Sequence, residues 1–218
     1  MSSCQCQGIE GCFNPKLVKR ELADYHRRGP RKTTRLLVEA LRAADVQGAT
    51  LLDIGGGVGA IQHALLQAGA AEATDVDAAT AYAEAARQEA ERLGLADRVR
   101  ILHGNFVELA PEIPAADVVT LDRVICCYDD MQALVGLSSE RARRLYGAVF
   151  PRDPGWARAI LPIFNAIPRL FGSHFRFFIH RTRDVEAVLR AHGLERRFHR
   201  TAGIWQVAVY ARTGAAAG

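Results

Sequence analysis

The segment Leu51-Leu52-Asp53-Ile54-Gly55-Gly56-Gly57-Val58-Gly59-Ala60 decides how the rest of this chain is interpreted. Its first four residues predict a short buried strand, and the glycines after them predict a tight turn that leads into a helix. Glycine adopts backbone angles that other residues avoid, and it lets a bound molecule approach the main chain closely. Gly55, Gly57 and Ala60 also fit the dinucleotide fingerprint G-x-G-x-x-[GA], so the loop alone leaves the cofactor open.

Short apolar runs alternate with helical patterns around this segment, which is typical of a parallel sheet covered on both faces. We expect strands at Thr50–Ile54, Glu72–Val76, Val99–His103, Asp117–Leu121 and Leu145–Phe150. We expect helices at Pro15–Arg28, Thr33–Ala44, Gly59–Ala68, Ala79–Leu93, Phe106–Leu109, Asp130–Arg141 and Asp184–His192, with Gly29-Pro30 separating the first two. Crossover connections of this kind are right-handed, so the pattern predicts a doubly wound α/β sheet.

The C-terminal part departs from the alternation. A helical insertion at Gly155–Leu170, in which the prolines predict a broken helix, precedes two strands at Leu194–His199 and Ile204–Ala211. Because only a turn around Ala202-Gly203 joins these strands, they are expected to pair antiparallel. The fold class is therefore α/β, with a seven-stranded, mostly parallel, Rossmann-like sheet and an antiparallel C-terminal strand.

Three regions are expected along the chain: a helical lid over residues 1–48, a core over 49–212 and a flexible tail over 213–218. The core would carry an apolar substrate insertion at about 154–180. The 218 residues are 49% hydrophobic and 24% charged, which is typical of one soluble globular domain and excludes a disulfide-stabilised mini-protein. The longest apolar stretch is too short and too interrupted for a membrane span, which needs ~20 residues.

Charge and the N-terminus narrow the function further. Residues 1–10 have neither a basic region nor an apolar core, so we expect a cytoplasmic protein without a secretory signal. A net charge of +4 without a basic stripe disfavours a nucleic-acid partner. Lysine occurs only at positions 16, 19 and 32, which excludes any mechanism that needs a lysine later in the chain.

The five cysteines are an odd number and are read as reduced thiols. Cys4-x-Cys6-x5-Cys12 lacks an evident fourth ligand, so it falls short of a structural zinc signature and we expect no metal. Cys126 and Cys127 are read as small buried hydrophobic residues, with soft ligands or reactive thiols as the alternative.

Three features favour S-adenosylmethionine over NAD as the cofactor. Asp53 precedes the glycines, where a carboxylate attracts a cationic cofactor and repels a pyrophosphate. No lysine is present for the Tyr-x-x-x-Lys pair of a short-chain dehydrogenase. The antiparallel C-terminal pair is also unlike a nucleotide-binding half-fold.

This combination, over about Ala49 to Arg212, resembles the class I S-adenosylmethionine-dependent methyltransferases. The resemblance implies that Gly55, Gly57 and Gly59 shape the cofactor pocket. It also implies that Asp77 accepts hydrogen bonds from the ribose hydroxyls, with Asp75 as a competitor one pleat earlier.

Further cofactor contacts follow from the same resemblance. Gly104-Asn105-Phe106 matches the adenine-binding segment, although Asn105 replaces the usual aspartate. Asp122, at the end of the fourth strand, joins the cofactor-binding candidates. Tyr25, in a segment that folds over the cofactor in many relatives, is another, together with Thr33 or Thr34.

From Asp122 onward the layout resembles the magnesium-protoporphyrin O-methyltransferases. The matching pieces are Asp122–Asp129, Ala148–Asp153 and Phe178-Ile179-His180. The resemblance implies methyl transfer to a carboxylate. The apolar insertion offers a wall for a flat substrate, and dimerisation is the alternative use. The expected wall residues are Trp156, Ile160, Leu161, Ile163, Phe164, Ile167, Leu170, Phe171, Phe175, Phe177 and Phe178.

The catalytic candidates are His180 first, Tyr128 second, and Arg123, which could pair with an acidic substrate as could Arg152, Arg176 or Arg181. His26, His174 and His199 are weaker candidates. The sequence thus predicts a methyltransferase that uses S-adenosylmethionine and acts on a small molecule at oxygen. The alternatives are an NAD-dependent oxidoreductase and a non-catalytic dimerising scaffold, and a homodimer is left open.

Overall fold

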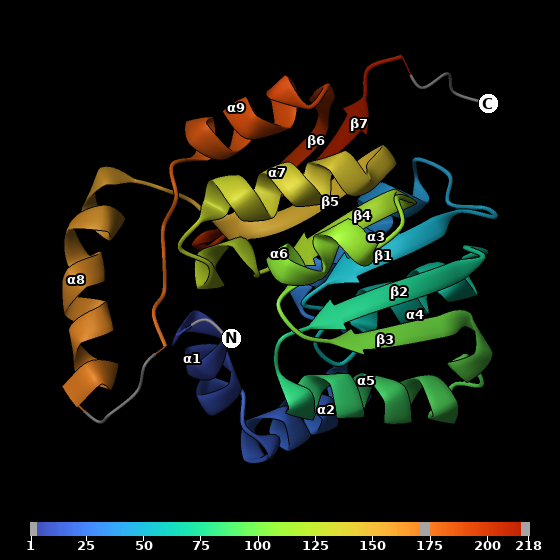
Figure 1. Cartoon of the computed structure of the whole chain (residues 1–218), viewed down its shortest axis with the longest axis horizontal. Helices are drawn as coiled ribbons and strands as arrows, with labels where there is room; N and C mark the ends of the chain where they lie inside the picture. Colours follow the sequence, from blue (N-terminus) through green and yellow to red (C-terminus); the bar gives the residue numbers. More distant parts are fainter. Residues whose placement is uncertain (1–3, 171–174, 215–218) are drawn as a thin grey trace.

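In the part of the chain that the structure describes, seven strands form one sheet in the order β3-β2-β1-β4-β5-β7-β6 (Figure 1). This computed structural model describes residues 4–170 and 175–214. Strands β1 to β5 run parallel, and β7 pairs antiparallel with both β5 and β6. The strands are β1 (Thr50–Ile54), β2 (Glu72–Asp77), β3 (Val99–His103), β4 (Ala116–Asp122), β5 (Ala142–Pro151), β6 (Leu194–Ala202) and β7 (Trp205–Arg212). The predicted fold class is confirmed.

Several strands are longer than the sequence predicted. Strand β5 begins three residues earlier, directly after the preceding helix, and ends at Pro151, which pairs with Trp205. Strand β6 continues to Ala202 although most of its residues are exposed. Hydrophobic alternation marks only the buried part of a strand, so it misses ladder positions that solvent covers.

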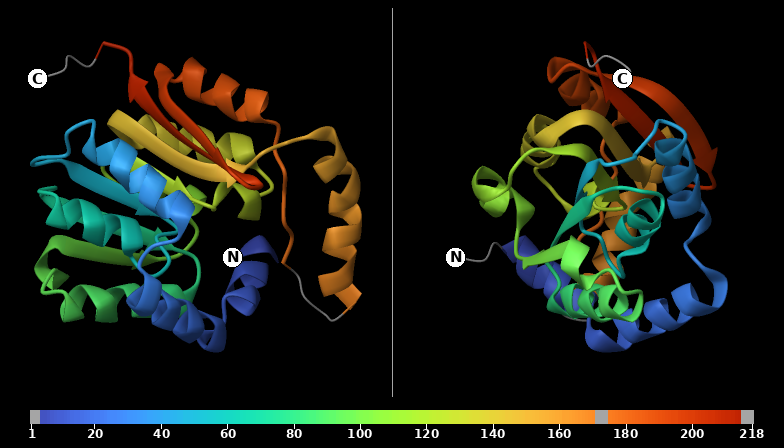
Figure 2. Two further views of the ribbon diagram at one scale, coloured as in Figure 1. Left: turned by 180° about the vertical axis from the view of Figure 1, so that it is seen from behind. Right: turned by 90° about the vertical axis from the view of Figure 1, so that its right-hand side faces the viewer.

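Helices cover both faces of the sheet, with α3 and α4 on one face and α7 and α9 on the other (Figure 2). The helices are α1 (Cys4–Cys12), α2 (Pro15–Arg28), α3 (Lys32–Arg42), α4 (Ala60–Gln67), α5 (Thr80–Arg92), α6 (Phe106–Leu109), α7 (Met131–Arg141), α8 (Gly155–Leu170) and α9 (Thr182–Ala191). The described residues also include the short 3-10 helices η1 (Ala96–Arg98), η2 (Ala110–Glu112) and η3 (Ile125–Cys127). Helix α1 was not predicted, because its sequence lacks an apolar periodicity.

Helix α3 packs directly on the centre of the sheet. Leu37 and Leu41 are fully buried in the core on this face. A Cβ on Gly147 of β5 would lie only 2.8 Å from Leu37 Cδ1, so a glycine is needed there for the helix to approach the strand. The region predicted as a lid therefore includes a helix that belongs to the core.

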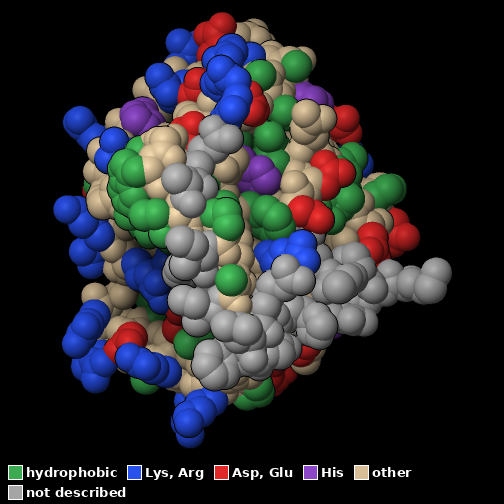
Figure 3. Space-filling view, turned by 90° about the vertical axis from the view of Figure 1, so that its left-hand side faces the viewer, with side chains coloured by type: hydrophobic (Ala, Val, Ile, Leu, Met, Phe, Trp, Pro, Cys, Tyr) green, Lys and Arg blue, Asp and Glu red, His purple; other side chains and the backbone are tan. Residues whose placement is uncertain are grey.

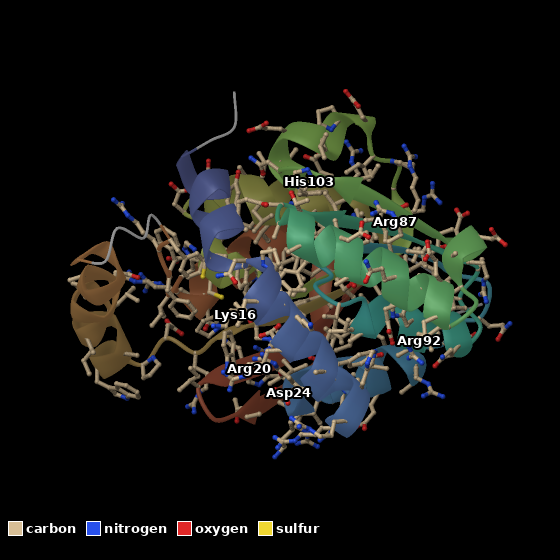
Figure 4. The ribbon with its side chains drawn as sticks, turned by 90° about the horizontal axis from the view of Figure 1, so that it is seen from below. Lys16, Arg20, Asp24, Arg87, Arg92 and His103 are labelled. Carbon is tan, nitrogen blue, oxygen red and sulfur yellow. The ribbon has the colours of Figure 1, made fainter. Side chains whose placement is uncertain are left out.

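Helix α2 begins at a side-chain cap and lies beside α5 (Figure 4). The Asn14 side chain accepts hydrogen bonds from the backbone N–H groups of Lys16 and Leu17, both at 3.1 Å. Val18 is buried in a small cluster with Tyr82 of α5. Gly29, with a φ of 70°, ends the helix by donating its N–H to the Tyr25 carbonyl, as the Gly29-Pro30 breaker predicted.

Helix α8 is continuous, so the prediction that its prolines break it is wrong. A proline removes one backbone donor and favours a kink, yet a helix can continue through it. The helix lies at the outside of the molecule, beside the extended segment 175–181 rather than against the sheet (Figure 1). Within the described residues, none of the helices combines the length and apolar character that crossing a bilayer requires.

We expect Leu37→Ala to lower the free energy of unfolding by about 2–5 kcal/mol, because it leaves a cavity between α3 and β5. Urea unfolding followed by circular dichroism measures this loss. Leu36→Ala, on the half-buried side of the same helix, is the matched control and should cost much less. Equal losses in the two variants would mean that α3 is not held by the core.

Candidate active site

A cavity of about 630 Å³ opens at the carboxyl ends of the central strands, where ligands bind in open α/β sheets. Eleven of the predicted site residues line it: Tyr25, Asp53, Gly55, Gly57, Asp77, Gly104, Asn105, Phe106, Asp122, Arg123 and Tyr128. Gly59 and His180 are predicted site residues that do not line it. The fold thus brings residues from the first strand, the N-terminal helices and the C-terminal half to one cavity.

The glycine turn allows a ligand to approach the main chain closely. Gly55 and Gly57 have φ values of 65° and 61°, in the left-handed region that favours glycine. A Cβ on Gly55 would lie 2.5 Å from Val124 Cγ2, and a Cβ on Gly56 would lie 2.6 Å from Asp75 Oδ1. Gly59 instead caps α4 above His63, which gives it a structural role away from the cavity.

Two carboxylates are buried beside this turn. Asp53 and Asp75 are directly paired across β1 and β2. Asp53 Oδ1 accepts from the Thr120 hydroxyl at 2.6 Å, whereas its Oδ2 has no hydrogen-bond partner among the described residues. Asp75 accepts from the Gln62 side-chain amide at 3.0 Å and from Gly56 N–H at 3.2 Å. Burial raises the pKa of Asp53 to about 7, and it raises the pKa of Asp75 well above its usual range.

Asp77, two residues further along β2, lines the cavity, whereas Asp75 lies under the glycine turn. The Asp77 carboxylate accepts from Ala79 N–H at 2.8 Å and from Gly57 N–H at 3.2 Å. Burial raises the pKa of Asp77 to about 6, against the effect of these hydrogen bonds. Asp77 is therefore the acidic residue of β2 that can meet a ligand.

The ends of β3 and β4 are joined across the cavity by Asn105 and Tyr128. Asn105 caps α6 by accepting from Val107 N–H at 3.1 Å, and its amide donates to the Tyr128 hydroxyl at 3.2 Å. Phe106 is buried beside them and also lines the cavity. The segment predicted to hold the adenine is thus fixed by its own capping bond.

An ion pair stands at the end of β4. Asp122 Oδ1 accepts from Arg123 Nε at 2.9 Å, and its Oδ2 accepts from the Thr34 hydroxyl of α3. Arg123 has a φ of 64°, a conformation that costs energy in a residue other than glycine and is found at functional sites. Its guanidinium carbon lies 5.9 Å from the centre of the Trp205 ring, within cation–π range.

The extended segment 175–181 closes one side of the cavity. Phe178 N–H donates to the Cys126 carbonyl at 2.7 Å, and the Asn165 side chain of α8 bonds both the N–H and the carbonyl of Phe177. Phe175 and Phe177 line the cavity, as predicted for the substrate wall. Their rings meet Phe13, the residue after α1, and Trp205 of β7 edge to face, at 5.8 Å and 6.3 Å.

The helical part of the predicted wall is placed differently. Trp156 and Ile160 are 63% and 52% exposed and do not line the cavity, so the expectation that they wall it is wrong. They lie on α8, which packs against the extended segment instead of the sheet. The side chains of Ile163, Phe164, Ile167, Leu170 and Phe171 lie outside the described part of the chain.

His180 lies outside the cavity wall and contacts Tyr128, which lines the cavity. Its Nε2 bonds the Tyr128 carbonyl at 2.7 Å, and its ring stacks on Phe178. The other histidine candidates are remote: His26 pairs with Glu89, and His199 bonds Gln206. His174 lies outside the described residues. Of the remaining arginine candidates, Arg152 and Arg176 are exposed, and Arg181 precedes α9.

Phe13, Glu21, Tyr82 and Trp205 are among the cavity residues that were not predicted. The Tyr82 hydroxyl of α5 donates a hydrogen bond to Glu21 of α2 at 2.5 Å. This bond connects α2 to α5 at the wall of the cavity. No local motif marks these residues, because each reaches the cavity through tertiary packing. Only Trp205 had a signal, since it begins the strand that pairs with the end of β5.

A family model described as an O-methyltransferase domain matches residues 8–149. The chain belongs to the O-methyltransferase domain family. Membership confirms the prediction of a methyltransferase that uses S-adenosylmethionine as its cofactor. The matched residues include α2, α3 and the sheet through most of β5, so the cofactor side of the cavity lies within the family's domain.

The curated relatives match a shorter part of this chain than the family model does. The ribosomal protein L11 methyltransferase of Enterobacter sp. is 36% identical over 91 residues, which is 42% of this chain and 30% of that protein. The chain therefore matches less than a third of that relative's length.

Solved structures share the fold. Magnesium protoporphyrin IX methyltransferase from Synechocystis, solved with bound SAH, aligns with a TM-score of 0.73 at 18% identity, covering 96% of this chain and 100% of that one. Mitomycin 7-O-methyltransferase aligns with a TM-score of 0.61 at 24% identity, covering 92% of this chain and 59% of that one.

The residues present fit an adenosyl sulfonium cofactor. Asp53 Oδ2, buried with no partner among the described residues, suits a cationic group better than a diphosphate. Asp77 offers acceptors for hydroxyls, and the open glycine turn leaves room for a ligand against the main chain. Asn105 and Phe106 supply a polar edge and an aromatic surface on the adenine side. The individual roles remain predictions.

The buried carboxylates give a pH prediction. Because their pKa values are raised in the folded chain, that chain holds protons that the unfolded chain has released, so stability falls as pH rises through the folded pKa values. We expect the free energy of unfolding to fall by about 1 kcal/mol or more from about pH 6 to about pH 8. His63, whose burial lowers its pKa to about 4, acts oppositely from about pH 4 up to its unfolded value near 6.5, so it offsets part of the fall at the lower end of this window.

Urea titrations at several pH values measure this effect. Asp53→Asn cannot titrate and should flatten the fall, while Asp97→Asn, at an exposed position of η1, should leave it unchanged. An equally steep fall in Asp53→Asn would contradict the assignment.

Proposed function

We propose that this protein transfers a methyl group from S-adenosylmethionine to a carboxylate oxygen of a flat, largely apolar small molecule. The observation that carries the proposal is Arg123, an arginine held by Asp122 and Thr34 inside a cavity with aromatic walls. The cavity volume of about 630 Å³ lies within the range of small-molecule sites.

Arg123 is a suitable carboxylate anchor because its bonds to protein are made on one side. Nε and Nη2 bond Asp122, and Nη2 also reaches the Thr34 hydroxyl at 3.2 Å. A guanidinium carries five donors in a planar fork. Among the described residues none accepts a hydrogen bond from Nη1, so Nη1 is available to an anionic acceptor. The carboxylate of Asp122 fixes the orientation of that fork in advance.

Aromatic side chains provide the surface for a flat acceptor. Phe175, Phe177 and Trp205 line the cavity together with Arg123, and Trp205 contacts both the Phe177 ring and the Arg123 guanidinium. Apolar walls with a few polar groups are the usual design of small-molecule sites. A planar molecule with a peripheral carboxylate fits both features.

Basic residues favour the approach of an acidic acceptor. Arg28, Arg31, Lys32 and Arg35 line the mouth of the cavity on α2, α3 and their connection. Lys and Arg side chains also gather along one margin of the face that carries α8 (Figure 3). Clusters of one sign steer charged ligands and raise their association rate.

The proposed methyl transfer requires little proton transfer by the protein. The cofactor supplies an activated methyl group on a sulfonium. A carboxylate acceptor is ionised at neutral pH and needs no general base, which agrees with the placement of His180 outside the cavity wall. Arg123 holds the acceptor in line, the Asn105–Tyr128 bond fixes part of the cavity wall, and Phe175 and Phe177 exclude water. His180 positions Tyr128 through its carbonyl.

Asp77→Asn should weaken S-adenosylhomocysteine binding by about 1–3 kcal/mol, because a charged acceptor is replaced by an amide. Calorimetric titration of the chain with S-adenosylhomocysteine, S-adenosylmethionine and NAD in parallel measures it. Asp97→Asn is the control. Unchanged affinity in Asp77→Asn would refute its ribose role, and tight binding of NAD alone would favour the oxidoreductase alternative.

Arg123→Gln should lower kcat/KM for carboxylated aromatic acceptors by about 10–100-fold, chiefly through KM, because a charge-assisted contact to the acceptor is lost. Methyl transfer from labelled cofactor to a panel of planar carboxylic acids and their amides measures this. Arg42→Gln, an exposed arginine on α3, is the matched control. An acceptor used equally well as acid and amide would refute the carboxylate assignment.

A further inference from the structure

Strands β1 and β2 each bury an acidic residue at the same level of the sheet. Asp53 of β1 and Asp75 of β2 are paired across the two strands and are 1% and 0% exposed. Asp53 lines the cavity, whereas Asp75 lies under the glycine turn and does not. The cofactor contact predicted for Asp53 leaves unexplained why a second carboxyl group is buried behind it.

The two carboxyl groups lie close together under Gly56. A Cβ on Gly56 would lie 2.6 Å from Asp75 Oδ1 and 3.0 Å from Asp53 Oδ2, so both oxygens border the same small space. Two ionised carboxylates that face each other in a buried site repel, and keeping both charged is costly. A proton held by the pair removes that repulsion.

The hydrogen bonds around the pair leave acceptors without donors. Thr120 donates to Asp53 Oδ1. Asp75 accepts from Gln62 and from Gly56 N–H, one bond on each oxygen. Asp53 Oδ2 and Gln62 Oε1 are buried and receive no hydrogen bond from any described residue. The cluster therefore has more buried acceptors than donors, and a carboxyl proton supplies a donor that it lacks.

The charged groups on the neighbouring strands do not neutralise the pair. Asp77 of β2 and Asp122 at the end of β4 add further negative charge. Arg123 bonds Asp122, and within the described residues no lysine or arginine bonds either carboxyl group of the pair. The charge balance therefore has to come from a proton or from a ligand.

The titratable groups of the packed helices and of β3 do not neutralise it either. His63 of α4 is neutral at pH 7, because burial lowers its pKa to about 4. Tyr82 of α5 is uncharged, because burial raises the pKa of its hydroxyl. His103 of β3 and Glu10 of α1 interact with Asp77. Burial raises the pKa values of both carboxyl groups of the pair, which agrees with a proton retained near neutral pH.

We propose that Asp75 is a positioning residue that shares one proton with Asp53 in the free chain, and that this proton leaves for solvent when a cationic cofactor binds beside Asp53. The inference rests on the predicted contact between Asp53 and S-adenosylmethionine. A carboxyl O–H gives up its proton to water, and the positive charge of the ligand then balances the pair. Asp75 acts through Asp53, since it does not line the cavity itself.

The shared proton makes the site selective for the charge of its ligand. S-adenosylmethionine carries a sulfonium in addition to its ammonium group, whereas S-adenosylhomocysteine has lost the sulfonium charge. The more positive ligand displaces the proton more completely, so its affinity gains more as pH rises. The pair therefore favours the methyl donor over the product of transfer, which helps the product to leave.

Calorimetric titration of the full chain with S-adenosylmethionine, in buffers of different ionisation enthalpy, counts the protons released per cofactor bound. We expect about 0.5–1 proton at about pH 6.5, with a Kd that falls about 3- to 10-fold from about pH 6 to about pH 7. Methylthioadenosine, which has neither cationic group, should bind without proton release. Infrared difference spectra should show that S-adenosylmethionine removes the C=O stretch of a protonated carboxyl group.

Asp75→Asn tests the pair directly. The amide of this variant is a permanent donor of nearly the same shape, so Asp53 stays ionised in the free chain and no proton is left to release. We expect release of less than about 0.2 proton and a Kd that changes by less than about twofold over the same pH range. Comparison with the wild type removes any proton that the cofactor itself exchanges. Asp97→Asn, at an exposed position, is the control and should behave as the wild type.

Undiminished proton release in Asp75→Asn would overturn the proposal, because Asp53 alone would then hold the proton. Binding of S-adenosylmethionine to the wild-type chain without proton release would overturn it as well. If Asp75→Asn does not fold, the wild-type proton count and infrared spectra still decide the question. These failures leave the proposed function intact, whereas an absence of S-adenosylmethionine binding would refute the proposed function itself.

Discussion

The buried carboxylates at the ends of β1 and β2 are the constraint around which this molecule is organised. The parallel register sets Asp53 opposite Asp75, and the two-residue period of a strand places Asp77 at the next position on the same side as Asp75. Each needs a donor because burying an unpaired carboxylate is costly. The donors come from different elements: Thr120 from β4, Gln62 from α4 and the N–H groups of the glycine turn. One oxygen of Asp53 still lacks a partner among the described residues, which makes a cationic ligand favourable there.

A second group of polar contacts, around Asp122, fixes the side of the cavity where we place the acceptor. Thr34 of α3 and Arg123 both bond Asp122, so an N-terminal helix is tied to the end of a central strand. Leu37, one turn later on α3, packs into the core below. The same helix therefore stabilises the sheet and orients the group that we assign to the acceptor. The left-handed backbone of Arg123 is tolerated because Asp122, Thr34 and Trp205 all hold its side chain.

The cofactor side could be predicted from sequence because its parts are local. Asp53 with the glycine turn, Asp77, and Gly104-Asn105-Phe106 each lie at the end of a strand that hydrophobic patterning detects. The acceptor side depends on residues from distant segments, such as Phe13 and Trp205, which share no motif. Helix α1 lacked an apolar period, and the prolines of α8 pointed wrongly to a break. His180 was singled out for its place before a helix, and its distance from the cavity wall follows from its bond to the Tyr128 carbonyl.

The cofactor side and the acceptor side of the cavity are held by different kinds of contacts. This difference affects how an acceptor enters. The cofactor side rests on a continuous hydrogen-bonded ladder, whereas segment 175–181 is held by a few bonds and by aromatic edges. Regions with few backbone bonds and little core packing open at a lower free energy than the sheet. Segment 175–181 lies outside this ladder, so we expect its opening to leave the glycine turn in place.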